Sequence, residues 1–188
     1  MKTYCINLES RPDRWRKVQK EAAKLNLTLT RVDAIRDMVP HMGCRQTHLN
    51  ILRFPDPVFM VIEDDMKVLQ PFDVLERAIS QLPEDWDMLY LGATLRKPLE
   101  RYSENLYRLK GGAATHAIIY NNQHGICEYI VENHDTVAVD IFYAKNVQEH
   151  FNCYMTYPMV ATQCPGYSDI LGHWTSYRGI QKNYKKFT

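Results

Sequence analysis

The sequence predicts a single mixed α/β domain in which a mostly parallel, Rossmann-like sheet is flanked by helices, with a small irregular region toward the C-terminus. Strand and helix patterns alternate over the first half of the chain, which is typical of parallel strands joined by crossover helices. Residues 58–62 (VFMVI) form the most apolar short run, as expected of a buried central strand. A length of 188 residues is enough for one hydrophobic core.

The first predicted unit is strand-helix-strand. Residues 3–7 are expected to form a strand, and Ser10 is the expected N-cap of a helix whose first turn contains Pro12 and Asp13. Residues 27–32 alternate well enough to form the second strand. The helix between them has one apolar face, formed by Trp15, Val18, Ala22 and Leu25.

The same alternation continues through the middle of the chain. Residues 33–41 are expected to form a loop and residues 43–54 a helix. The strand at 58–62 follows, then a helix near 74–81 and a strand at 88–91. The order is therefore β-α-β-α-β-α-β, which indicates a sheet covered by helices.

The second half is less regular. Short strands are expected at 107–109 and 117–120 and a helix at 123–133, and periodicity is weak beyond residue 147. The C-terminal segment is basic and aromatic. It is expected either to be solvated or to contact an anionic lipid surface or a phosphorylated acceptor. Its basic and aromatic members are Arg178, Lys182, Tyr184, Lys185, Lys186 and Phe187.

Composition narrows the class of protein. The chain has 45% hydrophobic and 24% charged residues, and its formal net charge of +1 predicts no nucleic-acid partner. Its five cysteines lie far apart with no Cys-x-x-Cys pair, which indicates reduced thiols and neither a disulfide framework nor a zinc site. No stretch is long and apolar enough for a transmembrane helix, and Glu9, Arg11 and Asp13 interrupt the N-terminus too early for a signal peptide. We therefore expect a cytoplasmic protein; its oligomeric state is not fixed by the sequence.

Three consecutive acids, Glu63, Asp64 and Asp65, end the central strand. A strand cannot bury three carboxylates, so they are expected to emerge at its C-terminal end, where open α/β sheets bind ligands. A divalent cation with oxygen ligands would relieve their mutual repulsion, and phosphate oxygens would complete its coordination. The alternative is a solvated acidic turn, and spacing alone does not decide between the two.

Several segments together resemble glycosyltransferase family 25, which includes bacterial lipooligosaccharide and procollagen galactosyltransferases. Residues 6–15 (INLESRPDRW) resemble the family's opening, and residues 43–49 (GCRQTHL) resemble its Gly-Cys-x-x-Ser-His-Leu segment, with Thr47 in place of serine. Residues 61–65 match its acidic metal motif. Further likenesses at 32–34, 106–111 and 139–140 keep the family's order over about residues 3–145. Beyond about residue 150 only the Ser-Asp-Ile at 168–170 resembles the family.

The resemblance implies a GT-A fold, Mn²⁺ or Mg²⁺, and a UDP-sugar donor. The reaction would transfer a hexose, galactose or glucose, with inversion to a hydroxyl of a glycan or glycosylated protein. On this basis residues 1–95 would form the half that binds the nucleotide-sugar and metal, and 96–188 the acceptor side. Asp65 is the expected metal ligand, Glu63 shares the metal or binds the ribose, and Asp64 points to the other side of the extended chain.

The resemblance also assigns residues near the first strand to the donor site. Asn7 and Leu8 stand at the strand end, and Arg11 and Arg14 hold the places of the family's Arg-x-x-Arg. The two arginines are expected to pair with phosphate or with an acid, or else to form a solvated helix start. Asp33 is expected to bind uracil or ribose, or to form a turn.

For four other expected site residues the sequence leaves two alternative roles open. His48 is a structural histidine or packs against the donor. Thr47 bonds a nearby loop or the helix backbone. Gly112 permits close approach of the donor sugar or makes a tight turn. His173 is a further metal ligand, as its chain position in the family suggests, or packs against Trp174.

An inverting transferase needs a base to accept the proton of the acceptor hydroxyl. Asp140 is the leading candidate because Val-Asp at 139–140 resembles a late family segment; its alternative role is to cap a helix. Asp169 is the second candidate base, or an acceptor contact.

Two other functions remain open from the sequence. A nucleotidyltransferase also uses strand-end carboxylates and a metal, but the chain has no glycine-rich phosphate loop. A sugar- or nucleotide-binding module would use aromatic side chains such as Trp86, Trp174 and Tyr177 without catalysis. The released product distinguishes the three: UDP, pyrophosphate or neither.

Overall fold

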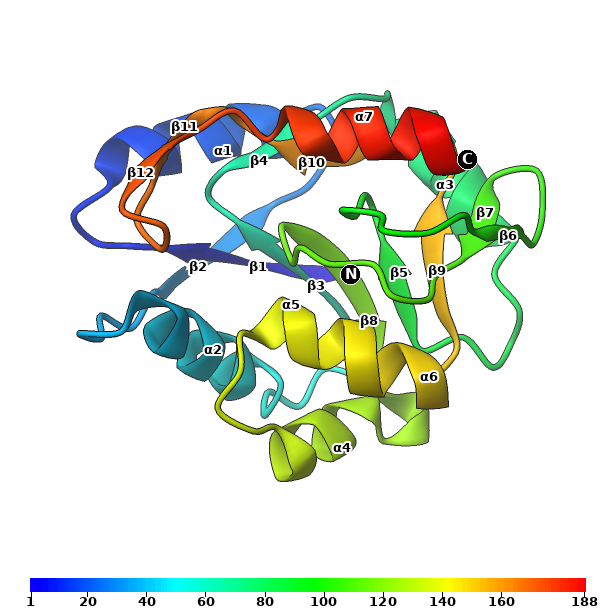
Figure 1. Ribbon diagram of the computed structural model, residues 1–188, viewed down its shortest axis with the longest axis horizontal. Coiled ribbons are helices and arrows are strands. Elements are labelled where there is room, and N and C mark those ends of the chain that lie inside the picture. The colour runs from blue at the N-terminus through cyan, green and yellow to red at the C-terminus, as the bar shows by residue number, and fades with distance from the viewer.

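The computed structural model describes residues 1–188 and contains an eight-stranded sheet in the order β2-β1-β3-β8-β5-β9-β7-β6 (Figure 1). Six strands share one direction: β1 (Lys2–Asn7), β2 (Leu29–Asp33), β3 (Val58–Glu63), β5 (Met88–Tyr90), β6 (Glu100–Arg101) and β9 (Cys153–Thr156). Two run the other way: β7 (Leu106–Arg108) and β8 (Ala117–Asn121). The sheet is therefore mostly parallel, as predicted.

Helices cover both faces of this sheet (Figure 1). On one side lie α1 (Pro12–Ala23), α3 (Phe72–Ser80) and α7 (Arg178–Phe187). On the other lie α2 (Pro40–Ile51), α4 (Ile126–Asn133), α5 (Val139–Phe142) and α6 (Gln148–His150), with 3₁₀ and π turns at Asn122–His124 and Tyr143–Val147. Two small ladders complete the fold: β4 (Met66–Val68) with β10 (Ala161–Gln163), and β11 (Gly166–Ser168) with β12 (His173–Thr175).

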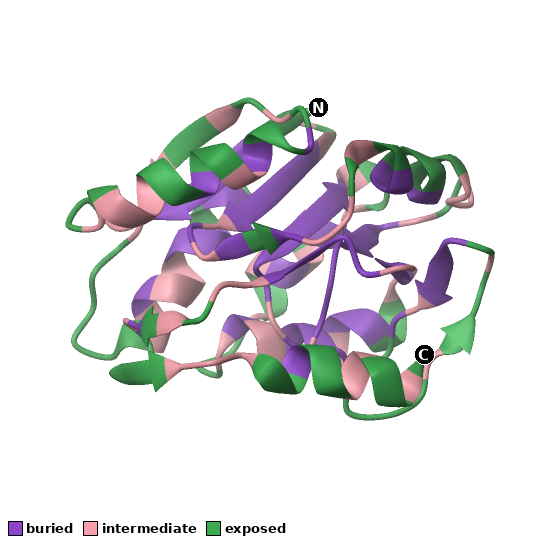
Figure 2. Ribbon diagram, turned by 90° about the horizontal axis from the view of Figure 1, so that it is seen from above, coloured by how far each residue is buried: buried purple, intermediate pink, exposed green.

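Alternation along β3 explains why the sheet needs helices on both sides. Phe59 and Val61 belong to one hydrophobic cluster, and Met60 and Ile62 to the other. All four side chains are buried, and each contributes about 1.5–3 kcal/mol relative to exposure. Figure 2 shows the central strands buried and the helices exposed on their outer sides. Because β3 pairs with β1 on one side and β8 on the other, its C-terminal end holds the following acids in a fixed position.

The structure corrects several boundaries of the predicted elements. The N-cap position of α1 is Arg11 and not Ser10, and no side chain caps the helix. Helix α2 begins at Pro40, three residues before the predicted start, because proline fits the first turn of a helix. Strand β8 lies antiparallel between β3 and β5, so the strand at 88–90 is not next to the acidic strand.

The region beyond residue 147 is more ordered than predicted. It supplies the buried inner strand β9 and the helix α7. The expected solvated tail is wrong for part of α7, because Ile180 is buried and the Tyr184 hydroxyl accepts a hydrogen bond from the Met159 amide at 3.0 Å. All five cysteines are free thiols. No helix has both the length and the apolar character needed to cross a bilayer.

Candidate functional site

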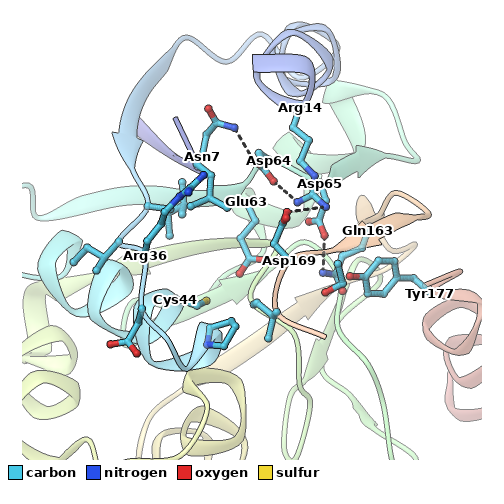
Figure 3. Close-up of a pocket in the computed structure, with 18 residues that line it drawn as sticks. Asn7, Arg14, Arg36, Cys44, Glu63, Asp64, Asp65, Gln163, Asp169 and Tyr177 are labelled. Carbon is cyan, nitrogen blue, oxygen red and sulfur yellow. Dashed lines mark hydrogen bonds and ion pairs between the residues drawn. The ribbon is translucent and has the colours of Figure 1, made fainter. Parts of the chain in front are cut away.

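A cavity of about 260 Å³ opens at the carboxyl ends of β1, β2 and β3 (Figure 3). One part of its wall follows those strands directly and includes Asn7, Leu8, the segment 34–37 and the three acids. The opposite part belongs to the C-terminal region. It is formed by Gln163, Ser168, Asp169, Ile170 and Tyr177. The cavity therefore combines the rigid strand ends with a segment from late in the chain.

Glu63 is the first of the three acids and is held by two hydrogen-bonding neighbours. The Thr115 hydroxyl donates to Glu63 Oε1 at 2.6 Å, and His48 Nε2 lies 3.3 Å from the same oxygen. Burial alone would raise the pKa of Glu63, but the hydrogen bonds and charge of His48 and the Thr115 hydroxyl hold it below its usual value. Glu63 is therefore ionised at neutral pH.

Asp64 faces the first strand and helix. Asn7 Nδ2 donates to one carboxylate oxygen at 2.7 Å, and the Arg14 guanidinium donates to the other at 2.8 Å. Burial raises the pKa of Asp64 above its usual value, and the attraction of Arg14 opposes this shift. With both oxygens occupied, Asp64 joins β1 and α1 to the end of β3.

Asp65 differs from its two neighbours because one of its carboxylate oxygens is buried without a partner. Gln163 Nε2 donates to Oδ2 at 3.1 Å, whereas Oδ1 has no hydrogen-bond partner. Burial, reinforced by the charges of Glu63 and Asp64, raises the pKa of Asp65 to about 8. An unpartnered buried oxygen is costly, so the site favours a proton or a cation there.

The donor set at this strand end suits a hard divalent cation. Glu63 and Asp65 supply carboxylate oxygens to the same cavity, and Mg²⁺ and Mn²⁺ prefer such ligands. A cation would partner the free Asp65 Oδ1 and relieve its repulsion with Glu63. The residues present therefore fit a Mn²⁺ or Mg²⁺ ion.

Two arginines at the start of α1 connect the strand ends to the C-terminal region. Arg11 lies 2.6 Å from an Asp169 carboxylate oxygen and 3.1 Å from Asp13. Arg14 lies 3.6 Å from the same Asp169 oxygen and donates to the Tyr167 carbonyl oxygen. Neither arginine is a free, solvated helix start. The two guanidinium groups place positive charge beside the acids, and guanidinium groups form strong hydrogen bonds with carboxylate or phosphate oxygens.

The helix α2 contributes one anchoring residue and two side chains near the cavity. The Thr47 hydroxyl donates to the Gly43 carbonyl at 2.8 Å and accepts from the Ile35 amide at 2.9 Å, so it bonds both the helix backbone and the loop after β2. His48 is 1% exposed and contacts Glu63. Cys44 lines the cavity.

Seven of the predicted site residues do not line the cavity. Arg11, Thr47 and His48 are three of them, and their contacts are given above. Asp33 is exposed, and one of its oxygens lies 3.5 Å from Arg31 Nε. Gly112 is buried, and its amide donates to Gln148 at 2.9 Å. The remaining two are His173, which is exposed on β12, and Asp140 on α5.

Asp140 nevertheless lies close to the acids on another side. Its carboxylate accepts a hydrogen bond from the Ala114 amide at 3.3 Å. The next residue, Thr115, donates to Glu63. Asp140 is in the first turn of α5 but is not its N-cap, which is Ala138. The two candidate bases therefore lie on different sides: Asp169 in the cavity wall, and Asp140 behind the 114–115 backbone.

Sequence reasoning missed part of the cavity lining. Arg36 and Asp37 follow the predicted end of β2, so the rule that ligands bind at strand ends would have included them. Gln163 is the last residue of the three-residue strand β10, and Tyr177 precedes α7 in the left-handed conformation with φ of 50°. No sequence signal marks Gln163, whereas the sequence predicts Tyr177 only as an aromatic side chain for a non-catalytic binding module.

No protein-family model and no curated protein sequence matches the chain. Among solved structures, the chain is similar to a glycosyltransferase involved in the glycosylation of the major capsid of PBCV-1. The identity is 9%, 98% of each chain is covered, and the TM-score is 0.55. This likeness is one of fold alone, and it confirms the predicted fold class, a mostly parallel Rossmann-like sheet flanked by helices of the kind found in GT-A proteins.

Two further solved structures have TM-scores below 0.5. A Drosophila beta-1,4-galactosyltransferase 7 mutant, in complex with manganese, UDP-Gal and xylobiose, is 7% identical over 86% of this chain and 69% of that chain, with a TM-score of 0.47. A putative glucose-1-phosphate thymidylyltransferase from Bacillus anthracis is 11% identical over 97% of this chain and 74% of that chain, with a TM-score of 0.48.

Proposed function

We propose that this chain is a metal-dependent glycosyltransferase of the family 25 type. It would transfer a hexose, galactose or glucose, from a UDP-sugar to a hydroxyl of a glycan or glycosylated protein, with inversion. The observation that carries the proposal is the buried Asp65 carboxylate with an unpartnered oxygen, beside Glu63, at the strand ends of a glycosyltransferase fold. The free cysteines are in keeping with the cytoplasm as the proposed location.

The proposed metal ligands are Asp65 and Glu63. A bound Mn²⁺ or Mg²⁺ would neutralise the negative charge that develops on the departing nucleotide diphosphate. The Gln163 amide holds Asp65 Oδ2, and Thr115 and His48 hold Glu63, so both carboxylates are oriented before an ion arrives. Asp64 is proposed as a brace, because both of its oxygens are already bonded.

The proposed diphosphate site lies next to the two arginines. Arg11 and Arg14 are paired with Asp169, whose side chain is 34% exposed. A phosphate group offers the same kind of oxygen acceptors, so it would displace this carboxylate from the guanidinium groups. Asn7 and Leu8 line the same end of the cavity and would contact the nucleoside.

Asp140 is the proposed base that accepts the proton of the acceptor hydroxyl. One of its oxygens accepts only a single backbone hydrogen bond, whereas Asp169 is engaged by two guanidinium groups. The Asp140 carboxylate is thus less occupied than that of Asp169, and it lies next to the 114–115 segment that contacts Glu63, outside the cavity wall that holds Asp169. Proton transfer to it would leave the acceptor oxygen free to attack the anomeric carbon.

The experiment that tests this proposal is nucleotide release from a panel of UDP-, GDP- and CMP-sugars with Mn²⁺, Mg²⁺ or EDTA. Asp65→Ala removes the proposed metal ligand. Asp73→Ala is the matched control, because Asp73 is an exposed acid paired only with Arg77 on α3. We expect metal-dependent UDP release from one sugar, which EDTA and Asp65→Ala abolish and Asp73→Ala preserves.

The other outcomes identify the competing functions. Release of pyrophosphate from a nucleoside triphosphate and a sugar phosphate would indicate a nucleotidyltransferase. Binding of a nucleotide-sugar without turnover, when a panel of glycan acceptors is also present, would indicate a binding module. If no nucleotide is released from any sugar in the panel and no donor raises the melting temperature, the proposed donor site is contradicted.

A further inference from the structure

We propose that Cys44, His48 and Glu63 form a second metal site, selective for a thiophilic divalent cation of the Zn²⁺ class. A sulfur, a nitrogen and a carboxylate oxygen from these residues all lie within 4.8 Å of one another. Thiolate, imidazole and carboxylate are the three side-chain ligand types that bind zinc in proteins. The set of all three differs in kind from the all-oxygen pair of Glu63 and Asp65.

Local structure brings the three ligands together. Cys44 and His48 are four residues apart on α2, so they lie on one face of the helix, one turn apart. Glu63 ends β3, and its Oε1 lies 3.3 Å from His48 Nε2. Zinc bonds of about 2.0–2.3 Å imply about 3.3–3.8 Å between ligand atoms of a tetrahedral site, so only small side-chain adjustments are needed.

The surroundings of the three side chains support a cation site. His48 is 1% exposed, and its Nε2 lies 3.3 Å from Glu63 Oε1, so the two ligand atoms face each other away from bulk water. Cys44 lines the cavity and gives an ion access from solvent. Figure 3 shows Glu63 extending toward Cys44, on the side of the strand end away from Asp64.

Metal binding at this site exchanges a proton for the ion. The Cys44 thiol loses its proton to solvent as the metal–sulfur bond forms, His48 binds through an unprotonated ring nitrogen and releases to solvent any proton held there, and Glu63 binds as the carboxylate. Three protein ligands leave the fourth position of a tetrahedral ion open to water or to a molecule in the cavity.

The sequence gives no zinc pattern because the site has a single cysteine. Zinc motifs are recognised by paired cysteines or histidines at short spacing, and here the carboxylate comes from a strand 15 residues after His48. The site therefore depends on how α2 packs beside the end of β3.

One consequence rests on the proposed function. Glu63 belongs both to the thiophilic site and to the proposed Mn²⁺ or Mg²⁺ site. Zn²⁺ bound by Cys44 and His48 would hold Glu63 away from Asp65, so zinc would inhibit sugar transfer in competition with Mn²⁺. The binding of zinc itself does not depend on what the enzyme transfers.

The experiment titrates Co²⁺, a spectroscopic substitute for Zn²⁺, into the reduced full chain without any sugar nucleotide. We expect sulfur-to-cobalt charge-transfer absorption that saturates at one ion per chain and disappears when Zn²⁺ is added. Cys44→Ser should remove this absorption and weaken Zn²⁺ binding by at least about 100-fold, since loss of a direct ligand costs more than loss of an outer neighbour. His48→Gln should weaken binding similarly.

Two matched variants distinguish this site from its neighbours. Cys164→Ser removes the other partly exposed thiol, which lies next to Asp65, and should leave the absorption intact. Asp65→Asn should also leave it intact. The proposal is overturned if the absorption is absent from the wild type, survives Cys44→Ser, or disappears in Cys164→Ser.

A further measurement avoids variants altogether, in case Cys44→Ser does not fold. X-ray absorption of the zinc-bound wild type should show one sulfur at about 2.3 Å and nitrogen or oxygen ligands at about 2.0–2.1 Å. A shell of oxygen and nitrogen alone would overturn the site. If UDP is released but no metal binds to a thiolate, the Cys44 site is refuted and the proposed transferase stands. If metal binds to a thiolate but no UDP is released, the proposed transferase is refuted and the Cys44 site stands.

Discussion

The two walls of the cavity are built in different ways. The strand wall consists of the carboxyl ends of β1, β2 and β3, which are held by parallel backbone pairing and buried cores on both faces. The C-terminal wall, residues 163–177, contains strands of only three residues and exposes large side chains, with Trp174 64% exposed. The acids therefore sit on the rigid wall, and the less supported wall covers them.

Side chains from the start of α1 hold the two walls together. Arg14 contacts Asp64 on the strand wall and Asp169 on the C-terminal wall, and Arg11 contacts Asp169 as well. Under the proposed function, the metal ligands therefore belong to the strand wall, whereas access to them depends on a few ion pairs. A precise site benefits from rigid supporting elements, and a cover must be able to release its ligand.

The largest effect should come from the strand wall. Asp65→Asn keeps the shape of the side chain but removes the charge that a cation needs, so metal-dependent turnover should fall about 1,000-fold. Steady-state UDP release at saturating donor and metal measures this, with circular dichroism as the check on folding. A loss of less than tenfold would show that Asp65 is not the essential ligand.

Arg14→Met tests the connection between the walls. It leaves the buried Asp64 carboxylate with only Asn7 as a partner, so the free energy of unfolding should fall by about 3 kcal/mol. Urea unfolding gives this value. Arg77→Met, which breaks an exposed pair within α3, is the control and should cost less than about 1 kcal/mol. Equal losses in both variants would contradict a special role for Arg14.

The raised pKa of Asp65 predicts a pH dependence specific to the strand wall. Because the folded state holds this proton up to about pH 8, Asp65 destabilises the metal-free protein as pH rises above its ordinary pKa. Relative to Asp65→Asn, the wild type should lose roughly 2 kcal/mol between pH 5 and pH 7, with a slope no steeper than about 1.4 kcal/mol per pH unit. Adding Mn²⁺ should remove the difference. If, without metal, the free energies of unfolding of the wild type and Asp65→Asn change equally with pH, Asp65 is already ionised over that pH range.

The smallest effect on stability should come from the C-terminal wall. Asp169→Asn weakens a partly exposed ion pair, so it should cost about 1 kcal/mol or less. Limited proteolysis should nevertheless cut residues 166–175 faster than in the wild type. Asp33→Asn, at an exposed aspartate 3.5 Å from Arg31, is the matched control and should leave cleavage unchanged. Unchanged cleavage in Asp169→Asn would mean that backbone contacts, and not this pair, hold the wall.

The strand wall was largely predictable from sequence. An apolar run that ends in acids indicates a buried strand with its carboxylates at the edge, and the structure has β3 in the middle of the sheet with Glu63 at its end. Alternation along an extended chain also predicts that Asp64 differs from its neighbours. It is the acid whose two oxygens are both taken by Asn7 and Arg14.

The C-terminal wall was not predictable for a physical reason. Strands β10, β11 and β12 have three residues each, too few for a hydrophobic period to appear. The antiparallel insertion of β8 between β3 and β5 depends on pairing between distant segments, which local patterns do not encode. Gln163 and Tyr177 reach the cavity only because of these distant contacts.

The distance along the chain between the two walls has a consequence for protein synthesis. A ribosome makes Asn7, Arg14 and the three acids before it makes residues 163–177, which begin more than 90 residues after Asp65. Strand β9, which pairs with β5 and β7 in the sheet, is also made late. A growing chain therefore carries its cluster of acids through the synthesis of more than 90 further residues before the covering wall exists. Until then, Arg14 and Asn7 are the partners available to restrain that charge.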